Sequence, residues 1–352
     1  MKLIIILLAL SVFVIGCSNP ANTIDRGDPT DAMFVAVGKD GKIAHSADGS
    51  NWITTTVGSQ TWSGVAFANR RWVAVGADGR IAYSIDGLNW AVARVGQYGV
   101  DFYQGLWRSV AFANNRWVAA GEGGAIAHSI DGANWTLLQV GQHSFFHVAS
   151  ANSGWVAVGL GAEGGAIARS TNGANWTLLQ IGEHGFFHVA SANRRWVAVG
   201  NGGVIERSGN GVNWTTTQAG DHDTGFSQSQ WRSVAFADGR WVVVAADGAI
   251  ARSTDGANWT VAQVNAEWNH VAFANGRWVT VGNGGAIAHS TDGISWTRMF
   301  IGVNAWNDVA FANGRWVAVG NGGAMAYSTD GINWTQITVD IAAWNAVFFG
   351  GN

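Results

Sequence analysis

Eight copies of one seven-residue phrase run through this chain of 352 residues. The phrase is Ser-x-Asp/Asn-Gly-x-Asn/Ser-Trp, and successive copies lie about forty residues apart, a period typical of propellers and other repeat arrays. A unit this short cannot bury a hydrophobic face alone, so neighbouring units must pack against one another. We call these phrases the boxes. They begin at Ser46, Ser84, Ser129, Ser170, Ser208, Ser253, Ser290 and Ser328, and end at Trp52, Trp90, Trp135, Trp176, Trp214, Trp259, Trp296 and Trp334.

Each unit predicts four short antiparallel strands, A to D. In the seventh unit, strand A is Val271–Ala274, strand B is Trp278–Val281, strand C is Ala286–His289, and strand D follows Trp296. The runs are rich in Val, Ile, Phe and Trp, and Asn-Gly, Gly-Gly and Asp-Gly pairs separate them, as in tight hairpins. No long window of the repeats has the period of a helix. The sequence therefore predicts an all-β fold.

The two ends of the repeat region are complementary. The first unit starts at Met33–Gly38, which aligns with strand B, so that it lacks a strand A. The chain ends with Trp344–Gly350, which aligns with strand A and has no strand B after it. Pairing these segments would close a ring without an open edge. We therefore predict an eight-bladed β-propeller of four-stranded antiparallel blades over residues 33–352, closed by the C-terminal strand joining the N-terminal blade.

The tryptophans follow the repeat. Of the 21, eight close the boxes, six open strand A and seven open strand B. Phe146 and Phe187 are expected at the two remaining strand A positions, and Phe34 at the remaining strand B position. An aromatic residue at the same place in every blade favours packing between neighbouring blades. No irregular tryptophan is left over as a platform for a sugar.

The extreme N-terminus predicts a signal and an anchor. The apolar run Leu3–Ile15 is too short to span a bilayer and is typical of a secretory signal. The stretch that ends in Gly16 and Cys17 resembles the lipobox of bacterial lipoproteins, in which the chain is cleaved before the cysteine and the sulfur is lipidated. The resemblance implies a signal peptide over 1–16, a lipidated Cys17 with a polar tether over 17–32, and a place in the bacterial cell envelope. Ser18 after the cysteine implies the outer membrane.

The boxes resemble the Asp-box (BNR) repeats of sialidase-like propellers, although one residue fewer separates Asp from Trp here. In that family the box forms the turn between strands C and D, on the face away from the ligand. We expect the Ser and Asp side chains to accept hydrogen bonds from backbone N–H groups of the turn, with the Trp packed beneath. Asn172 and Asn210 replace two of the aspartates, which favours this role over metal binding. No metal and no cofactor is predicted.

The resemblance does not extend to the catalytic residues of sialidases. The Arg-Ile-Pro of those enzymes is missing, and both prolines, Pro20 and Pro29, precede the repeats. We therefore predict a protein that is not an enzyme. The alternative is a glycoside hydrolase or lyase of the sialidase-like type, which would need a close pair of carboxylates at the loop-bearing mouth of the channel.

Ligand contacts are expected where units depart from the consensus, because loops on a rigid scaffold carry function. Two D-to-A connections are longer than the others, and the fourth unit has extra residues in its B-to-C connection. Both kinds of connection should share the face opposite the boxes. Drift in a tolerant loop is the alternative explanation. The candidate ligand-binding residues in these connections are Tyr98, Asp101, Tyr103, Gln104, Glu163, Asp221, His222 and Asp223.

One strand A position varies from unit to unit and adds further candidates. It carries His147, His188, His270 and Asp308, whereas the other units have Gly64, Ser109, Ser233 and Ala346. We predict that this row contacts a ligand near the channel mouth. The pairs His143/His147 and His184/His188 have the spacing of helical zinc ligands, but they lie on a loop entering a strand, so a metal is not predicted.

Charge narrows the class of partner. The chain has 20 basic and 23 acidic residues and no basic run, which excludes a nucleic-acid-binding surface of the usual kind. The sequence as a whole indicates a monomeric, lipid-anchored propeller that serves as a binding or assembly scaffold. Its ligand would be a protein partner or a glycan at the face that carries the long connections.

Overall fold

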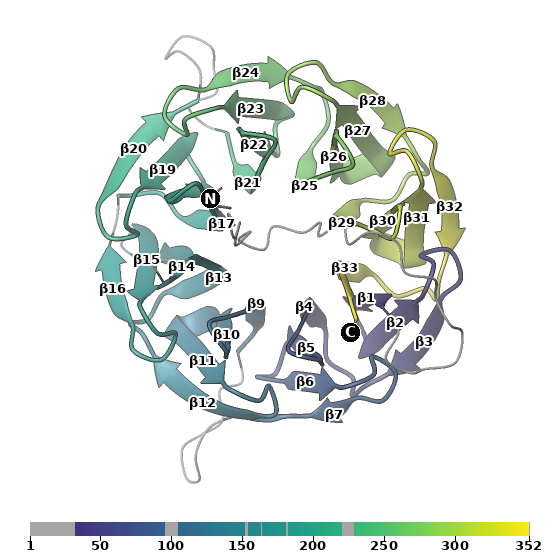
Figure 1. Cartoon of the computed structure of the whole chain (residues 1–352), viewed down its shortest axis with the longest axis horizontal. Coiled ribbons are helices and arrows are strands. Elements are labelled where there is room, and N and C mark those ends of the chain that lie inside the picture. Colours follow the sequence, from purple (N-terminus) through teal and green to yellow (C-terminus); the bar gives the residue numbers. More distant parts are fainter. Residues whose placement is uncertain are drawn as a thin grey trace, which may run out of the picture.

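A computed structural model describes residues 32–95, 105–151, 154–162, 164–180, 182–219 and 229–351. Eight antiparallel sheets stand around a central axis like the blades of a propeller (Figure 1). Each sheet has four strands in the predicted order A to D from the centre outwards, and blade 3 gains a short outer strand, β8 (Arg94–Val95), parallel to its strand D. Among the described residues no helix is long and apolar enough to cross a membrane.

The blades are numbered along the chain and their strands run from the innermost to the outermost. Blade 1 has β33 (Trp344–Gly350), β1 (Met33–Gly38), β2 (Lys42–Ser46) and β3 (Ile53–Thr56). Blade 2 has β4 (Trp62–Ala68), β5 (Arg71–Gly76), β6 (Ile81–Ser84) and β7 (Ala91–Val92). Blade 3 has β9 (Trp107–Ala113), β10 (Arg116–Gly121), β11 (Ala125–Ser129) and β12 (Asn134–Gln139). Blade 4 has β13 (Ser144–Ala151), β14 (Gly154–Gly161), β15 (Gly164–Ser170) and β16 (Thr177–Gln180).

The second half of the ring repeats this order. Blade 5 has β17 (Phe186–Ala192), β18 (Arg195–Gly200), β19 (Val204–Ser208) and β20 (Trp214–Gln218). Blade 6 has β21 (Trp231–Ala237), β22 (Arg240–Ala245), β23 (Ala249–Ser253) and β24 (Thr260–Gln263). Blade 7 has β25 (Trp268–Ala274), β26 (Arg277–Gly282), β27 (Ala286–Ser290) and β28 (Thr297–Phe300). Blade 8 has β29 (Trp306–Ala312), β30 (Arg315–Gly320), β31 (Ala324–Ser328) and β32 (Thr335–Thr338).

The ring closes as predicted. Strand β33 lies beside β1 and pairs with it antiparallel (Figure 1). Phe34 is opposite Phe349, and Met33 is opposite Gly350. Phe34 is fully buried, and its ring meets that of Phe349 edge-on at 4.9 Å between centroids. The last strand of the chain therefore supplies the inner edge of the first blade, and no long strand edge is left open there.

The core lies between blades, where the tryptophans were expected. One cluster combines Val279 and Val281 of blade 7 with Trp306 and Trp316 of blade 8, all of them buried. The predicted strand A alignment of blades 4 and 5 was wrong by one residue. In blade 4, Phe145 and not Phe146 pairs with Gly159 of strand B, as Trp62 pairs with Gly76 in blade 2. A β-bulge after this aromatic residue adds the extra residue. In blade 5 the same shift gives the buried place to Phe186 and leaves Phe187 at the bulge.

The boxes form the turns between strands C and D. In the first box, Ser46 Oγ accepts from Gly49 N–H at 2.8 Å, and Asp48 Oδ1 accepts from Asn51 N–H at 2.9 Å. The indole N–H of Trp52 donates to Gly49 O. Asn210 Oδ1 accepts two backbone N–H bonds in its own box, at 2.9 Å each, as the aspartates do elsewhere. The predicted hydrogen-bonding role is therefore confirmed.

Candidate functional site

A cavity of about 560 Å³ lies at the centre of the ring and is lined by the innermost strands of all eight blades. The B-to-C turns and the D-to-A connections meet at one end of it. Gly41 N–H of such a turn donates to Gln60 O at 2.7 Å, and Gly285 N–H donates to Asn304 O at 2.8 Å. Strand C begins at this end and finishes at a box. The boxes therefore lie at the opposite end, as the sequence predicted.

The variable strand A position forms a row around the cavity, which we call the lumen row. Its members follow the β-bulge, two residues after the buried aromatic residue that opens each innermost strand. From blade 1 to blade 8 they are Ala346, Gly64, Ser109, His147, His188, Ser233, His270 and Asp308. The four predicted contact residues are thus brought to one wall, which blades 4 to 8 supply. Blades 1 and 2 contribute only an alanine and a glycine.

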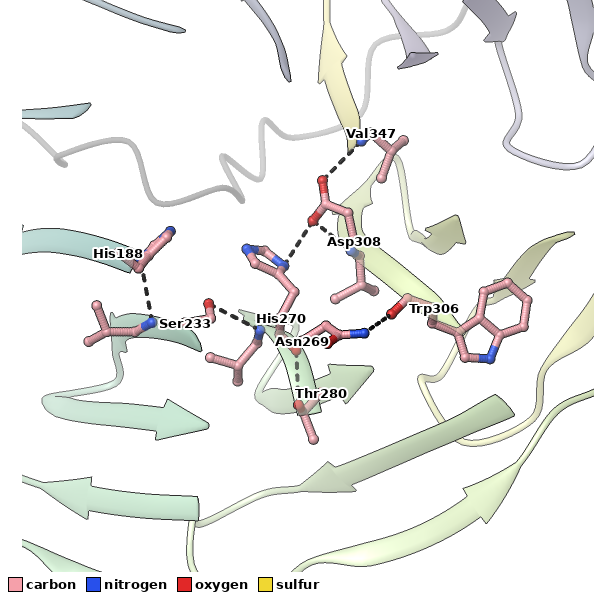
Figure 2. Close-up of polar contacts among 11 residues, drawn as sticks. His188, Ser233, Asn269, His270, Thr280, Trp306, Asp308 and Val347 are labelled. Carbon is pink, nitrogen blue, oxygen red and sulfur yellow. Dashed lines mark hydrogen bonds and ion pairs between the residues drawn. The ribbon is translucent and has the colours of Figure 1, made fainter. Parts of the chain in front are cut away.

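A charged pair stands at one end of this wall. His270 Nδ1 lies 2.9 Å from Asp308 Oδ1, and both side chains are mostly buried (Figure 2). Asp308 Oδ2 also accepts from Val347 N–H at 2.9 Å, and Oδ1 accepts from Val309 N–H. Burial lowers the pKa of His270, but the attraction of the Asp308 carboxylate outweighs it, and the pKa is raised overall. The carboxylate is therefore held by one imidazole and two backbone groups.

The pKa values of His147 and His188 are shifted in the opposite direction. The rings of His147 and His188 lie 3.9 Å apart between centroids, and His188 meets His270 at 6.2 Å. Burial, together with the charge on His270, lowers the pKa of His147 to about 4. Burial and both neighbouring imidazoles lower the pKa of His188 as well. The pKa values of His147 and His188 are therefore lowered on a wall where that of His270, beside the Asp308 carboxylate, is raised.

This arrangement predicts an acid-sensitive fold. Because the folded-state pKa of His147 lies below its ordinary value of 6.5, the unfolded chain takes up the proton first, and stability falls as the pH drops from 6.5 toward 4. Replacing His147 and His188 by asparagine should reduce this loss of stability by about 1–2 kcal/mol, a figure lowered because both side chains face the central cavity. Urea unfolding of both proteins across this pH range measures the effect. An unchanged pH profile in the double variant would contradict it.

A second row lies nearer the mouth, at the bulge residues, and we call it the rim row. In three successive blades it holds asparagines that tie neighbouring blades together. Asn269 Nδ2 donates to Trp306 O at 2.8 Å, Asn307 Nδ2 to Trp344 O at 2.8 Å, and Asn345 Nδ2 to Trp62 O at 2.7 Å. From blade 1 to blade 8 the rim row is Asn345, Ser63, Arg108, Phe146, Phe187, Arg232, Asn269 and Asn307.

Blades 4 and 5 break this pattern with two partly exposed phenylalanines. The rings of Phe146 and Phe187 lie 5.7 Å apart, and the Arg108 guanidinium stands 5.6 Å from the centre of the Phe146 ring. A second hollow of about 540 Å³ opens over these three residues and also touches Lys39 and Asn345. It shares Ser63, Arg108 and Asn345 with the central cavity, so the two hollows adjoin at the rim row. The mouth thus combines apolar and basic side chains.

The predicted candidates divide into two groups. His147, His188, His270 and Asp308 lie together on the cavity wall. The remaining candidates fall outside the described residues; they are Cys17, Tyr98, Asp101, Tyr103, Gln104, Glu163, Asp221, His222 and Asp223. The rim row was not predicted from the sequence, and Phe146 and Phe187 were expected in the core. An alignment of the repeats at the residue that follows each strand A tryptophan could have revealed the rim row.

No group of three or more His, Cys, Asp or Glu side chains among the described residues could hold a metal ion. The imidazoles of the lumen row instead face one another and the backbone of the next blade.

Eight blades around one cavity define this chain as an eight-bladed β-propeller. No family model and no curated protein matches its sequence. Among solved structures, apo AztD from Citrobacter koseri is 10% identical with a TM-score of 0.61, and the match covers 91% of this chain and 98% of that one. The computationally designed Ika8 protein is 14% identical with a TM-score of 0.60, over 88% and 97%. YCF48 bound to D1 peptide is 18% identical with a TM-score of 0.55, over 86% and 96%. At these identities the likeness shows the propeller fold alone.

Proposed function

We propose that this propeller is a non-catalytic binding scaffold that holds a protein partner at the mouth lined by the rim row. The observation that carries the proposal is the break in that row. Blades 7, 8 and 1 use the rim residue to tie blades together, whereas blades 4 and 5 expose Phe146 and Phe187 beside Arg108. Aromatic residues and arginine are enriched where proteins bind proteins. One of the solved propellers with this fold, YCF48, was captured with a peptide.

Two further features complete the proposal. The lipobox-like stretch at Cys17 would tether the propeller to the bacterial cell envelope, which requires acylation of that residue. A glycosidase would need two carboxylates at the mouth. Among the described residues that line the central cavity, Asp308 is the single carboxylate, and His270 and two backbone N–H groups already engage it. This favours binding over hydrolysis.

The test removes the aromatic rings of Phe146 and Phe187 without disturbing the blades. Phe146→Asn and Phe187→Asn introduce the side chain that blades 7, 8 and 1 carry at this position, so folding should be preserved. We expect the double variant to lose at least about 90% of the partner retained by the wild-type chain in a cross-linking pull-down from envelope extracts, as loss of a central aromatic anchor does.

The control is Ile130→Ser, which removes an exposed apolar side chain from a box on the opposite face. It should retain the partner fully. Equal retention of the partner by the wild-type chain, the double variant and the control would overturn the proposal that the partner binds at this mouth. Binding to a glycan array in place of any protein would favour the sugar alternative.

A further inference from the structure

The innermost strand of every blade presents one edge to the channel, and N–H groups on that edge have no strand partner. At four junctions a lumen-row side chain accepts from the valine of the following blade. Ser109 Oγ accepts from Val148 N–H at 3.3 Å, and Ser233 Oγ accepts from Val271 N–H at 3.4 Å. His188 bonds Val234 N–H and Asp308 bonds Val347 N–H in the same way (Figure 2). His147 and His270 face the N–H groups of Val189 and Val309 of the following blades in the same way. The lumen row therefore forms a girdle that offers a polar side chain at six of the eight junctions.

The girdle has a gap two blades wide. The residues that precede the next two junctions are Ala346 and Gly64, and neither carries an acceptor atom. By the repeat, the N–H groups at these junctions are those of Val65 and Val110, and both valines line the central cavity. No side chain of the described residues accepts from either of them. A partly buried N–H without an acceptor is costly, so an incoming oxygen would be bound favourably.

The surroundings of the gap select a negatively charged oxygen. Lys39 and Arg108 line the hollow directly above it, and no carboxylate of the described residues lines that hollow. Arg108 also contacts Glu122, which balances part of its charge. Asp308 lies in blade 8, two blades away from Val65, and its charge is engaged by His270. Backbone N–H donors below basic side chains are a recurring arrangement for binding anions.

We propose that the gap binds a carboxylate group, whose oxygens accept from the N–H groups of Val65 and Val110. This inference rests on the proposed function, because the simplest source is an acidic side chain of the protein partner whose apolar neighbours contact Phe146 and Phe187. A free small carboxylate has the same chemistry and would occupy the same donors. The absence of a side chain at Gly64 lets the ligand approach the backbone closely.

The decisive variant closes the gap with a residue that the ring already uses. Gly64→Ser should place its hydroxyl over Val110 N–H, as Ser109 does over Val148 N–H. A Cβ atom at residue 64 would lie 3.4 Å from Arg108 O and 3.5 Å from Val75 Cγ2, so the added atom fits. Ala346→Ser should do the same for Val65. Gly64→Ala and unchanged Ala346 form the matched control, because alanine fills the same space without an acceptor.

The measurement follows the two amides directly. The full chain is labelled with ¹⁵N-valine and titrated with sodium acetate, then with a blocked Gly-Asp-Gly peptide and its Gly-Asn-Gly counterpart. We expect saturable amide shifts at Val65 and Val110, and none at Val148 and Val271, whose N–H groups are already bonded. The Gly64→Ser/Ala346→Ser double variant should bind both acids about tenfold more weakly or not at all. Gly64→Ala should bind like the wild-type chain.

The outcomes separate this inference from the proposed function. Tighter binding of the aspartyl peptide than of acetate supports an acidic side chain as the source, and equal binding supports a small carboxylate. Shifts of the same size in the wild-type chain and the double serine variant, or no saturable shift at all, would overturn the carboxylate site. If the serine variant keeps its protein partner while Phe146→Asn/Phe187→Asn loses it, the scaffold stands and an acidic side chain of that partner is not the source of the carboxylate. If acetate binds but no protein partner is retained at the mouth, the carboxylate site stands and the proposed scaffold function falls.

Discussion

Replacing Trp344 by alanine should lower the free energy of unfolding by about 3–5 kcal/mol, the usual cost of deleting a large buried aromatic side chain. Trp344 is fully buried, packs against blade 8 and donates its indole N–H to Val339 O at 2.9 Å. Its backbone carbonyl accepts from Asn307 of the neighbouring blade. The substitution therefore weakens the blade at which the ring closes. Urea unfolding followed by circular dichroism measures the change.

Ile341 provides the matched control, since it lies three residues away and its side chain is 88% exposed. Ile341→Ala should change the free energy of unfolding by less than about 0.5 kcal/mol. Removing residues 344–352 altogether should have a larger effect, because the inner edge of β1 would be left unpaired, and we expect aggregation in size-exclusion chromatography. A truncated chain that remains monomeric and unfolds at the wild-type urea concentration would contradict this account of closure.

Replacing Asp308 by alanine should cost about 2–4 kcal/mol at pH 6, because it leaves the His270 imidazolium and two backbone N–H groups without their acceptor. The effect should depend on pH. The raised pKa of His270 means that its pair with Asp308 contributes most below the unfolded value of 6.5. That contribution is lost as the pH rises through the folded value. The difference between wild type and variant should therefore shrink in alkaline solution.

Asp238→Asn is the control for this experiment. Asp238 is also in contact with a cation, Arg240, but its side chain is 55% exposed and the pair lies on the surface. Its replacement should change stability by less than about 1 kcal/mol, with no comparable pH dependence between pH 5 and 8. A constant difference between wild type and Asp308→Ala over this range would show that the carboxylate acts only as a backbone acceptor.

The ring could be predicted from the sequence because the box and its strands are repeated eight times. Each box carries its own turn chemistry, and the missing strand before Met33 matches the unpaired strand at Trp344. The bulge was harder to predict. It inserts a residue without any glycine or proline signal, and in blades 4 and 5 two adjacent phenylalanines made the register ambiguous. Only the pairing of Phe145 with Gly159 decides which ring is buried and which faces the mouth.

Part of the candidate site could likewise be predicted from the sequence, and part could not. His147, His188, His270 and Asp308 occupy one repeat position, so their common placement followed from alignment. Which imidazole is neutral depends on distances across blades, because only His270 lies beside a carboxylate. The gap at Gly64 and Ala346 was hidden for another reason: it consists of backbone donors that small side chains leave uncovered. A pattern of side chains does not mark such donors until the strands are placed.

The pairing of β33 with β1 also has a consequence for biosynthesis. The seven residues of β33 are translated after the other strands that the structure describes, yet they complete the blade whose remaining strands, β1 to β3, are the first of these to be made. The inner edge of β1 therefore stays unpaired until β33 has been synthesised. We expect nascent chains stalled before Trp344 to be protease-sensitive in blade 1, and the addition of β33 to convert the whole ring to a resistant form.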